Sequence, residues 1–424
     1  MVKLSIPLRA VTRYYLIPFI LVTTMFFAWG VANNMTDTLL SAFKRIMSMS
    51  DFQTSWIQLA FYGSYFCLAL PAAMLIRRFS YKTGILVGLG LFILGSVLFY
   101  PASHTMVYGH FLTALFVLAG GLSFLETTAN PYILAMGEES TSIQRLNLAQ
   151  SFNPIGSITG VLLSKFFILD KLNTADALTR QNLSAGELEE IQRAELSAVM
   201  GPYVSVAAVL FVLWLIIYFT KMPTGIMSDR NVNLGETLKR LFARINYRRG
   251  VIAQFFYMGA QIGIWSFTIR YVMQELNVME SDASSYYLAA LILFTISRFV
   301  FTGLLERYKA GTLLAIAAFG GASFLLISIF AGGWIGVIAL VAISAGLSLM
   351  FPTIFGLALL GLGEDKKMAG SGLIMAMLGG ALLPAVQGLV SDSFNSIQLS
   401  FIIPLICLVM VGLYGLSSLK ATHA

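Results

Sequence analysis

The sequence has few charged residues, which fill only 11% of its 424 positions, whereas about a quarter is typical of soluble proteins. Cysteine and histidine are also rare, with two and three residues, and no Cys-x-x-Cys or His-Glu-x-x-His string occurs. No glycine-rich phosphate loop is present either. These absences argue against a soluble domain, against an enzyme, and against a bound metal ion or cofactor.

Hydrophobic residues make up 58% of the chain, and they gather in runs of about 20 residues, the length of a helix that crosses a bilayer. Backbone groups in lipid must bond within their own segment, so such runs predict an all-α integral membrane protein. We predict twelve spans, at residues 14–41, 52–76, 83–101, 107–136, 146–169, 200–220, 250–275, 284–305, 311–331, 334–360, 368–391 and 396–418.

The net charge of +7 follows the arrangement of these spans. If the N-terminus is cytoplasmic, most of the 27 lysine and arginine residues fall in cytoplasmic segments, as the positive-inside rule requires. We therefore predict that both termini are cytoplasmic. The charge is explained by topology and does not indicate a nucleic-acid partner.

Landmarks in the first half of the chain recur in the second half. A basic turn ending in Lys-x-Gly follows the second and the eighth span, and Asn130-Pro131 in the fourth span matches Phe351-Pro352 in the tenth. The offsets of about 220–230 residues are those expected of a duplicated six-helix unit. We predict an N-terminal six-helix bundle at 1–220, a cytoplasmic linker at 221–249 and a C-terminal six-helix bundle at 250–424.

Two carboxylates fall well inside the predicted spans, Asp37 in the first and Glu126 in the fourth. An ionisable group at such a place costs about 2.5–3.5 kcal/mol on insertion scales, so a chain that keeps one is expected to use it. Both groups would be neutral when buried and ionised when hydrated, which suits a two-stage proton relay. The alternative is a structural carboxyl group that ties two helices together by hydrogen bonds.

Amide side chains lie in the first, fourth and fifth predicted spans. They are Asn34, Asn130, Gln150 and Asn153. An amide both donates and accepts hydrogen bonds, which suits the hydroxyl groups of a sugar. Trp29 and Trp265 offer flat apolar faces for a sugar ring. For each tryptophan taken alone, packing or a place in the membrane's aromatic belt is the more common role.

Two arginines, Arg270 and Arg298, fall in or near the seventh and eighth spans. Each can either pair with a carboxylate or extend its charged end to the membrane interface. Extension to the interface is the more common outcome, and we expect it here.

Five strings of the sequence together resemble one transporter group. They are NNMTD (33–37), LETTANP (125–131), LNLAQSFN (146–153), GAQ (259–261) and FPTIF (351–355). In this order they are similar to the fucose/galactose/glucose group of the major facilitator superfamily. The resemblance implies the major facilitator fold, with twelve transmembrane helices in two six-helix bundles around a central cavity. It further implies a monomer in the inner membrane of a bacterium, with membrane lipids, a sugar and protons as its partners.

The resemblance also implies a function and a site. It implies proton-coupled uptake of a sugar by alternating access, with L-fucose as the expected sugar and with Asp37 and Glu126 as the protonatable groups. It adds Gln261 to the expected sugar-binding residues, which are then Trp29, Asn34, Asn130, Gln150, Asn153, Gln261 and Trp265. Phe351 stands where fucose transporters of the group carry a tyrosine, and the missing hydroxyl leaves the exact sugar open. The alternatives are a sodium-coupled symporter for galactose or glucose and a proton-coupled efflux antiporter of the same fold.

Overall fold

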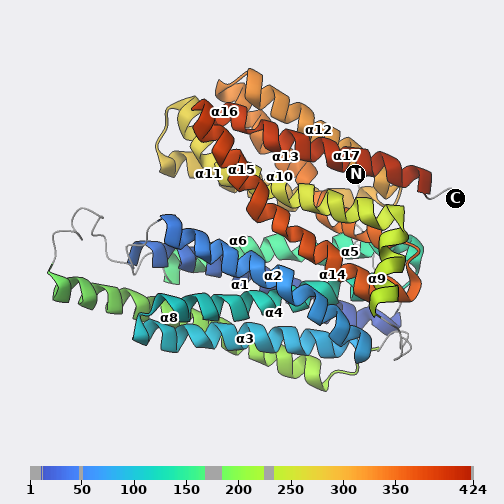
Figure 1. Ribbon diagram of the computed structural model, residues 1–424, viewed down its shortest axis with the longest axis horizontal. Coiled ribbons are helices and arrows are strands. Elements are labelled where there is room, and N and C mark those ends of the chain that lie inside the picture. The colour runs from blue at the N-terminus through green and yellow to red at the C-terminus, as the bar shows by residue number, and fades with distance from the viewer. Residues whose placement is uncertain (1–10, 12, 47–50, 168–183, 224–233, 422–424) are drawn as a thin grey trace. The chain divides into compact units, whose positions relative to one another are not determined.

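The structure is a computed structural model that describes residues 11, 13–46, 51–167, 184–223 and 234–421 (Figure 1). The described residues form helices and no strands. The α-helices are α1 (Leu16–Ile46), α2 (Asp51–Arg78), α3 (Tyr81–Thr105), α4 (Tyr108–Ala135), α5 (Ser142–Gln150), α6 (Phe152–Phe167), α8 (Ala185–Phe219), α9 (Leu234–Ala243), α10 (Ile245–Leu276), α11 (Glu280–Leu304), α12 (Ala310–Phe330), α13 (Gly333–Leu359), α14 (Lys366–Met375), α15 (Gly379–Phe394), α16 (Ile397–Ser400) and α17 (Ile402–Ala421). The 3-10 helices are η2 (Arg13–Tyr15), η3 (Glu139–Thr141), η5 (Gly363–Asp365) and η6 (Ala376–Leu378).

Within the described residues, eight helical stretches are long and apolar enough to cross a membrane. They are Leu59–Arg78, Tyr81–Thr105, Tyr108–Ala135, Asp282–Leu304, Ala310–Phe330, Gly333–Leu359, Gly363–Phe394 and Ile397–Leu419. Leu16–Ala32 and Val204–Phe219 are shorter apolar stretches. Most predicted spans therefore coincide with observed helices to within a few residues. The sixth differs, because its helix α8 already begins at Ala185, inside the preceding predicted loop.

The predicted fifth span is broken into two helices. Helix α5 ends at Gln150 and α6 begins at Phe152. Pro154 explains the break, because proline has no backbone N–H and cannot bond to the carbonyl group four residues earlier, which is that of Gln150. This carbonyl group needs another donor if it is buried.

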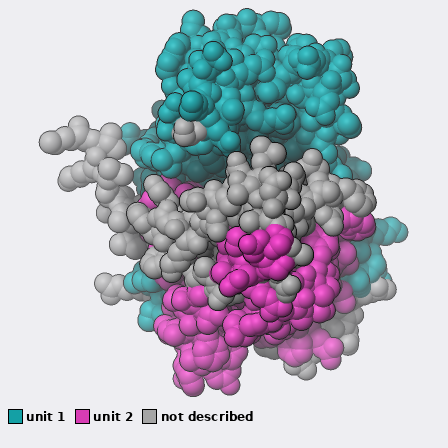
Figure 2. Space-filling model, turned by 90° about the vertical axis from the view of Figure 1, so that its left-hand side faces the viewer, with its two compact units in different colours: residues 1–20, 129–151, 225–424 teal, residues 21–128, 152–224 magenta. Residues whose placement is uncertain are grey.

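The contacts of the chain divide it into two compact units, shown in teal and magenta in Figure 2. Unit 1 comprises residues 1–20, 129–151 and 225–424, and unit 2 comprises residues 21–128 and 152–224. In unit 1, α5 packs against α11 and α13, and α12 packs against both α13 and α17. The predicted bundles at 1–220 and 250–424, with a linker at 221–249, stay a prediction.

In unit 2, α3 and α8 lie side by side over a long stretch (Figure 1). The indole nitrogen of Trp214 donates to the carbonyl oxygen of Leu86 at 2.9 Å. The Lys82 ammonium donates to the carbonyl oxygens of Tyr218 and Thr220 at 2.7 and 2.8 Å. A cation is favourable at the C-terminal end of a helix, where carbonyl groups lack partners. These bonds fix the last turns of α8 against the start of α3.

Helices α1 and α6 meet through glycine. A Cβ atom at Gly156 would overlap the backbone carbonyl oxygen of Phe27, and one at Gly160 would meet the backbone of Val31. On the other helix, a Cβ atom at Gly30 would overlap the carbonyl oxygen of Asn153. Small residues allow such close approach between membrane helices. The two backbones therefore touch, and this contact sets the position of the polar residues on both helices.

We predict that replacing Gly156 with leucine destabilises the protein. The obstacle is backbone, which cannot move aside like a flexible side chain, so the cost should reach the upper end of overpacking, about 3 kcal/mol. The melting temperature in detergent should fall by roughly 3 °C. Gly63→Leu is the matched control, because a Cβ atom at Gly63 has nothing within 4 Å. Equal melting temperatures for the two variants would contradict the tight α1–α6 contact.

Candidate functional site

Glu126 is a carboxylate inside an apolar helix. It lies in α4 and is only 3% exposed. The hydroxyl group of Tyr65, on α2, donates a hydrogen bond to its Oε1 atom at 3.0 Å. Ser123, one turn before Glu126, donates to the backbone carbonyl oxygen of Tyr65 at 3.2 Å. These two hydrogen bonds hold α2 and α4 together at Tyr65 and Glu126. The sequence analysis did not identify Tyr65 as a partner of this carboxylate.

Asp37, the other predicted carboxylate, belongs to α1. Its side chain lies outside the described residues. Of the two predicted carboxylates, the structure therefore describes the side chain of Glu126 only.

The polar residues of α1 and α6 bond to the backbone of α1. Asn153 donates to the carbonyl oxygen of Phe26 at 3.2 Å, and Asn34 donates to that of Gly30 at 3.4 Å. The ring of Trp29 stacks on that of Phe26, with centroids 5.7 Å apart. Trp29, Asn34 and Asn153 are all part-buried, so each side chain keeps some accessible surface.

Unit 1 contains the other predicted amides. Gln150, in α5, donates to Oδ1 of Asn130, in α4, at 2.7 Å. Nδ2 of Asn130 is buried and has no hydrogen-bond partner among the described residues. A buried donor without an acceptor is costly. Gln261, in α10, is part-buried.

Trp265, also in α10, is held by polar and aromatic contacts. Its indole nitrogen donates to the Ser344 hydroxyl oxygen at 3.3 Å. Its ring meets those of Phe294 and Tyr287 edge to face, with centroids 5.1 and 6.3 Å away. The ring is part-buried, so it retains an accessible portion. These contacts fix the orientation of the ring but leave part of its surface uncovered.

Arg298, in α11, does not extend to the interface as predicted. The side chain is 4% exposed, and its charged end lies 4.6 Å from the centroid of the Phe294 ring. Nε donates to the carbonyl oxygen of Ser348 at 2.7 Å, and Nη1 donates to that of Gln150 at 3.0 Å. The expectation was wrong for Arg298, whereas Arg270 is exposed, as expected of an interfacial arginine.

Proline explains why Arg298 turns inward. The two carbonyl groups that accept its hydrogen bonds lie four residues before Pro352 and Pro154. In a regular helix these carbonyl groups would bond to the N–H of those positions, but proline has none. Guanidinium carries several N–H donors in a rigid plane, so one side chain can satisfy both carbonyl groups. Arg298 thereby links α11 to α13 and α5.

A second buried arginine closes the end of α4. Arg145 is fully buried in α5 and donates to the carbonyl oxygens of Ile133 at 2.9 Å and Leu134 at 2.8 Å. Nearby, the Lys366 ammonium bonds to Oε1 of Glu139, and this hydrogen bond lowers the pKa of the Glu139 carboxyl group below its ordinary value. Arg145 thus satisfies two carbonyl groups in the last turn of α4.

The structure distributes the predicted residues over both units. Trp29, Asn34, Glu126 and Asn153 belong to unit 2, and Asn130, Gln150, Gln261 and Trp265 belong to unit 1. Two of the predicted residues, Gln150 and Asn130, bond to each other directly. Glu126 and Asn130 are one turn apart on α4, which places them on the same face of that helix.

The fold and these residues define a class of protein. Apolar helices of membrane-spanning length carry a buried carboxylate, partly exposed amides and two fixed tryptophans. Ionisable and polar groups inside membrane helices mark pathways for solutes and protons. The class is a multi-pass α-helical membrane transporter.

Comparison with known proteins gives the family. The family model for the Major Facilitator Superfamily matches residues 19–379, and the chain belongs to this superfamily. It is 39% identical over 423 residues to the L-fucose-proton symporter of Haemophilus influenzae, covering 97% of this chain and 99% of the relative. It is 38% identical to the L-fucose-proton symporter of Escherichia coli, covering 95% and 93%. A glucose/galactose transporter of Brucella abortus is 32% identical, covering 94% and 93%.

A solved structure agrees with these relatives. The crystal structure of the major facilitator superfamily transporter FucP in its outward conformation matches with a TM-score of 0.91 and 37% identity, covering 96% of this chain and 99% of that one. The predicted fold class, an all-α integral membrane protein with the twelve-helix major facilitator fold, is confirmed. The protein is a transporter of the inner membrane and not an enzyme.

Proposed function

We propose that the protein takes up L-fucose together with protons. The observation that carries the proposal is Glu126, a carboxyl group buried in an apolar helix with one hydroxyl donor, Tyr65. The relatives at 38–39% identity, each named an L-fucose-proton symporter, support the choice of sugar and of coupling ion.

Glu126 and Asp37 are the proposed proton carriers. A carboxyl group surrounded by apolar side chains favours its neutral form, and contact with water favours the ionised form. Glu126 would therefore bind a proton when its surroundings close and release it when they are hydrated. Tyr65 would steady the carboxylate by donating its hydroxyl hydrogen, and then accept a hydrogen bond once Glu126 is protonated.

The proposed sugar-binding residues are Trp29, Asn34, Asn130, Gln150, Asn153, Gln261 and Trp265. Support comes from the partly exposed tryptophan rings and from the unpartnered Nδ2 donor of Asn130. Aromatic faces pack on the apolar face of a sugar ring, and amides bond its hydroxyl groups. Phe351 packs against Tyr257 and Phe355 and offers no hydroxyl group to the sugar.

The proposed mechanism is alternating access by a monomer. The bundle at 1–220 and the bundle at 250–424 would move relative to each other, joined by the linker at 221–249. Both termini would be cytoplasmic, as the distribution of lysine and arginine indicates.

Transport in proteoliposomes tests the proposal. We expect an inward pH gradient to drive accumulation of labelled L-fucose, and we expect unlabelled L-fucose to compete better than D-galactose or D-glucose. Uptake that ignores the pH gradient would remove the proton coupling. Uptake of a hexose driven by a sodium gradient would select the sodium-coupled alternative, and drug resistance without sugar binding would select the efflux alternative.

A further inference from the structure

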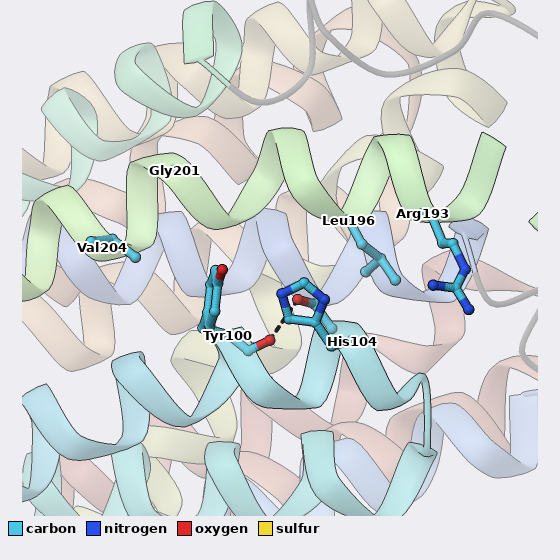
Figure 3. A pocket seen from close by; sticks show the side chains of 7 residues that line it. Tyr100, His104, Arg193, Leu196, Gly201 and Val204 are labelled. Atoms are coloured by element: carbon cyan, nitrogen blue, oxygen red, sulfur yellow. Dashed lines mark hydrogen bonds between the residues drawn. The ribbon is translucent and has the colours of Figure 1, made fainter. Parts of the chain in front are cut away.

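A pocket of about 520 Å³ lies between α3 and α8 of unit 2 (Figure 3). Tyr100 and His104 line it from α3, and Arg193, Leu196 and Val204 line it from α8. Gly201 has no side chain and leaves open space in the wall. None of these residues belongs to the proposed sugar and proton site.

The pocket lies where both helices pass from apolar to polar surroundings. The apolar span of α3 ends at Thr105, one residue after His104. In α8 the last charged residue is Glu195, and the sequence from there to Phe219 carries no charge. Arg193 precedes Val204 by eleven residues, or roughly 16 Å along a helix. One end of the pocket is therefore cationic and lies on the aqueous side, and the other end is apolar and lies at the edge of the hydrocarbon region.

The pocket continues into an exposed apolar surface on both helices. On α3, Leu94, Val97 and Tyr100 follow at helical spacing and are all exposed. On α8, Val204 is followed by the exposed Val212 two turns on. These stripes face lipid, so an acyl chain can lie along them while its headgroup occupies the pocket.

We propose that this pocket binds one phospholipid with a primary ammonium in its headgroup. Arg193 and His104 would hold the phosphate group, with the Tyr100 ring at the level of the headgroup, where tyrosine is favoured. Val204 and Leu196 would contact the first part of an acyl chain. The exposed carboxylates of Glu187 and Glu190 lie beyond Arg193 on α8, which favours an ammonium next to the phosphate over a purely anionic headgroup.

Native mass spectrometry of the full chain tests the proposal. The purified protein is titrated with phosphatidylethanolamine, with phosphatidylglycerol and with inorganic phosphate. Val204→Trp fills the pocket, and Val209→Trp is the matched control, since Val209 is an exposed apolar residue of the same helix that does not line the pocket. We expect wild type and Val209→Trp to retain one phosphatidylethanolamine, and Val204→Trp to bind it at least tenfold more weakly.

A second pair of variants tests phospholipid binding in the pocket even if Val204→Trp fails to fold. Arg193→Ala should weaken phosphatidylethanolamine binding about tenfold, whereas Arg270→Ala, an exposed arginine of α10 outside the pocket, should not. Equal binding by Arg193→Ala and Arg270→Ala would overturn the proposal, as would wild-type binding by Val204→Trp. Preferential binding of phosphatidylglycerol would overturn the assigned headgroup, and displacement of the lipid by inorganic phosphate would show a phosphate site only.

Discussion

Glu126→Gln is expected to abolish proton-driven sugar accumulation while sparing exchange of sugar across the membrane. Glutamine has nearly the same shape as glutamate, and its carbonyl oxygen can still accept the hydrogen bond from Tyr65. The variant should therefore fold and bind sugar. It cannot take up or release a proton at this position, so the sugar gradient loses its link to the proton gradient.

The size of the effect follows from the energy of the gradient. A difference of one pH unit supplies about 1.4 kcal/mol per proton, which corresponds to tenfold accumulation if one proton moves with each sugar. In proteoliposomes the wild type should approach this ratio, and Glu126→Gln should stop at equal concentrations. Counterflow, in which external labelled sugar exchanges with unlabelled sugar inside, measures the sugar exchange that Glu126→Gln should retain.

A control carboxylate separates coupling from general damage. Glu275 ends α10 and accepts hydrogen bonds from Gly333 and Gln398. Glu275→Gln should keep the full accumulation ratio, because no proton pathway is assigned to it. Uphill uptake by Glu126→Gln would exclude Glu126 from the mechanism. Loss of coupling in both variants would contradict a specific role of Glu126 in proton coupling.

Arg298→Met is expected to destabilise the protein strongly and to stop transport. The substitution preserves much of the side-chain volume but leaves the carbonyl groups of Ser348 and Gln150 without donors. Each orphaned buried carbonyl group costs about 1–3 kcal/mol, so the loss should be about 4 kcal/mol in total. Thermal unfolding in detergent measures it. Arg298→Lys should rescue little, because one ammonium lacks the planar fork that reaches both acceptors.

A double variant tests the reason given for this loss. Pro352→Ala restores the N–H that a regular helix would direct at the Ser348 carbonyl group. In the Arg298→Met background it should therefore recover roughly half of the lost stability, since one of the two carbonyl groups regains a donor. Strictly additive effects of the two substitutions would refute the pairing of Arg298 with proline. Arg270→Met, at an exposed arginine, should change stability by less than about 0.5 kcal/mol.

Hydropathy was sufficient to predict the helices, because the bilayer imposes both their length and their composition. It did not predict the break at Ser151, which depends on a single missing N–H at Pro154 and barely changes the apolar character of the span. It also did not predict how far α8 extends before residue 200, because the charged residues of α8 lie between Glu187 and Glu195 and make this part of the helix too polar to be predicted as a span.

The inward direction of Arg298 agrees with the exposure of its neighbours in α11. Leu288, Ile292, Ile296 and Val300 recur every four residues along α11, and all four are exposed. Two residues along a helix correspond to a rotation of about 200°, so Arg298 lies opposite the stripe that contains Ile296. The exposed stripe is recognised only in the structure, because Leu291, Phe294 and Phe299 make the other faces of this helix apolar as well.

Tyr65 illustrates what a sequence cannot supply. It shares a helical face with Ala69 and Ala72, and this small-residue stripe marks the packed side of α2. The stripe predicts that Tyr65 points inward, but its distance of 3.0 Å from Glu126 depends on how α2 and α4 are aligned along their lengths. That alignment is a property of packing between distant segments.

The length of α8 bears on how this protein can be imaged. Its 35 residues extend roughly 52 Å, well beyond the hydrocarbon core of about 30 Å. The capping box of Ser184 and Glu187 secures its first turn, so the projecting part begins as an ordered helix. A helix that extends beyond the detergent belt offers an antibody fragment an ordered epitope, and the bound fragment would give images of a small transporter a recognisable feature.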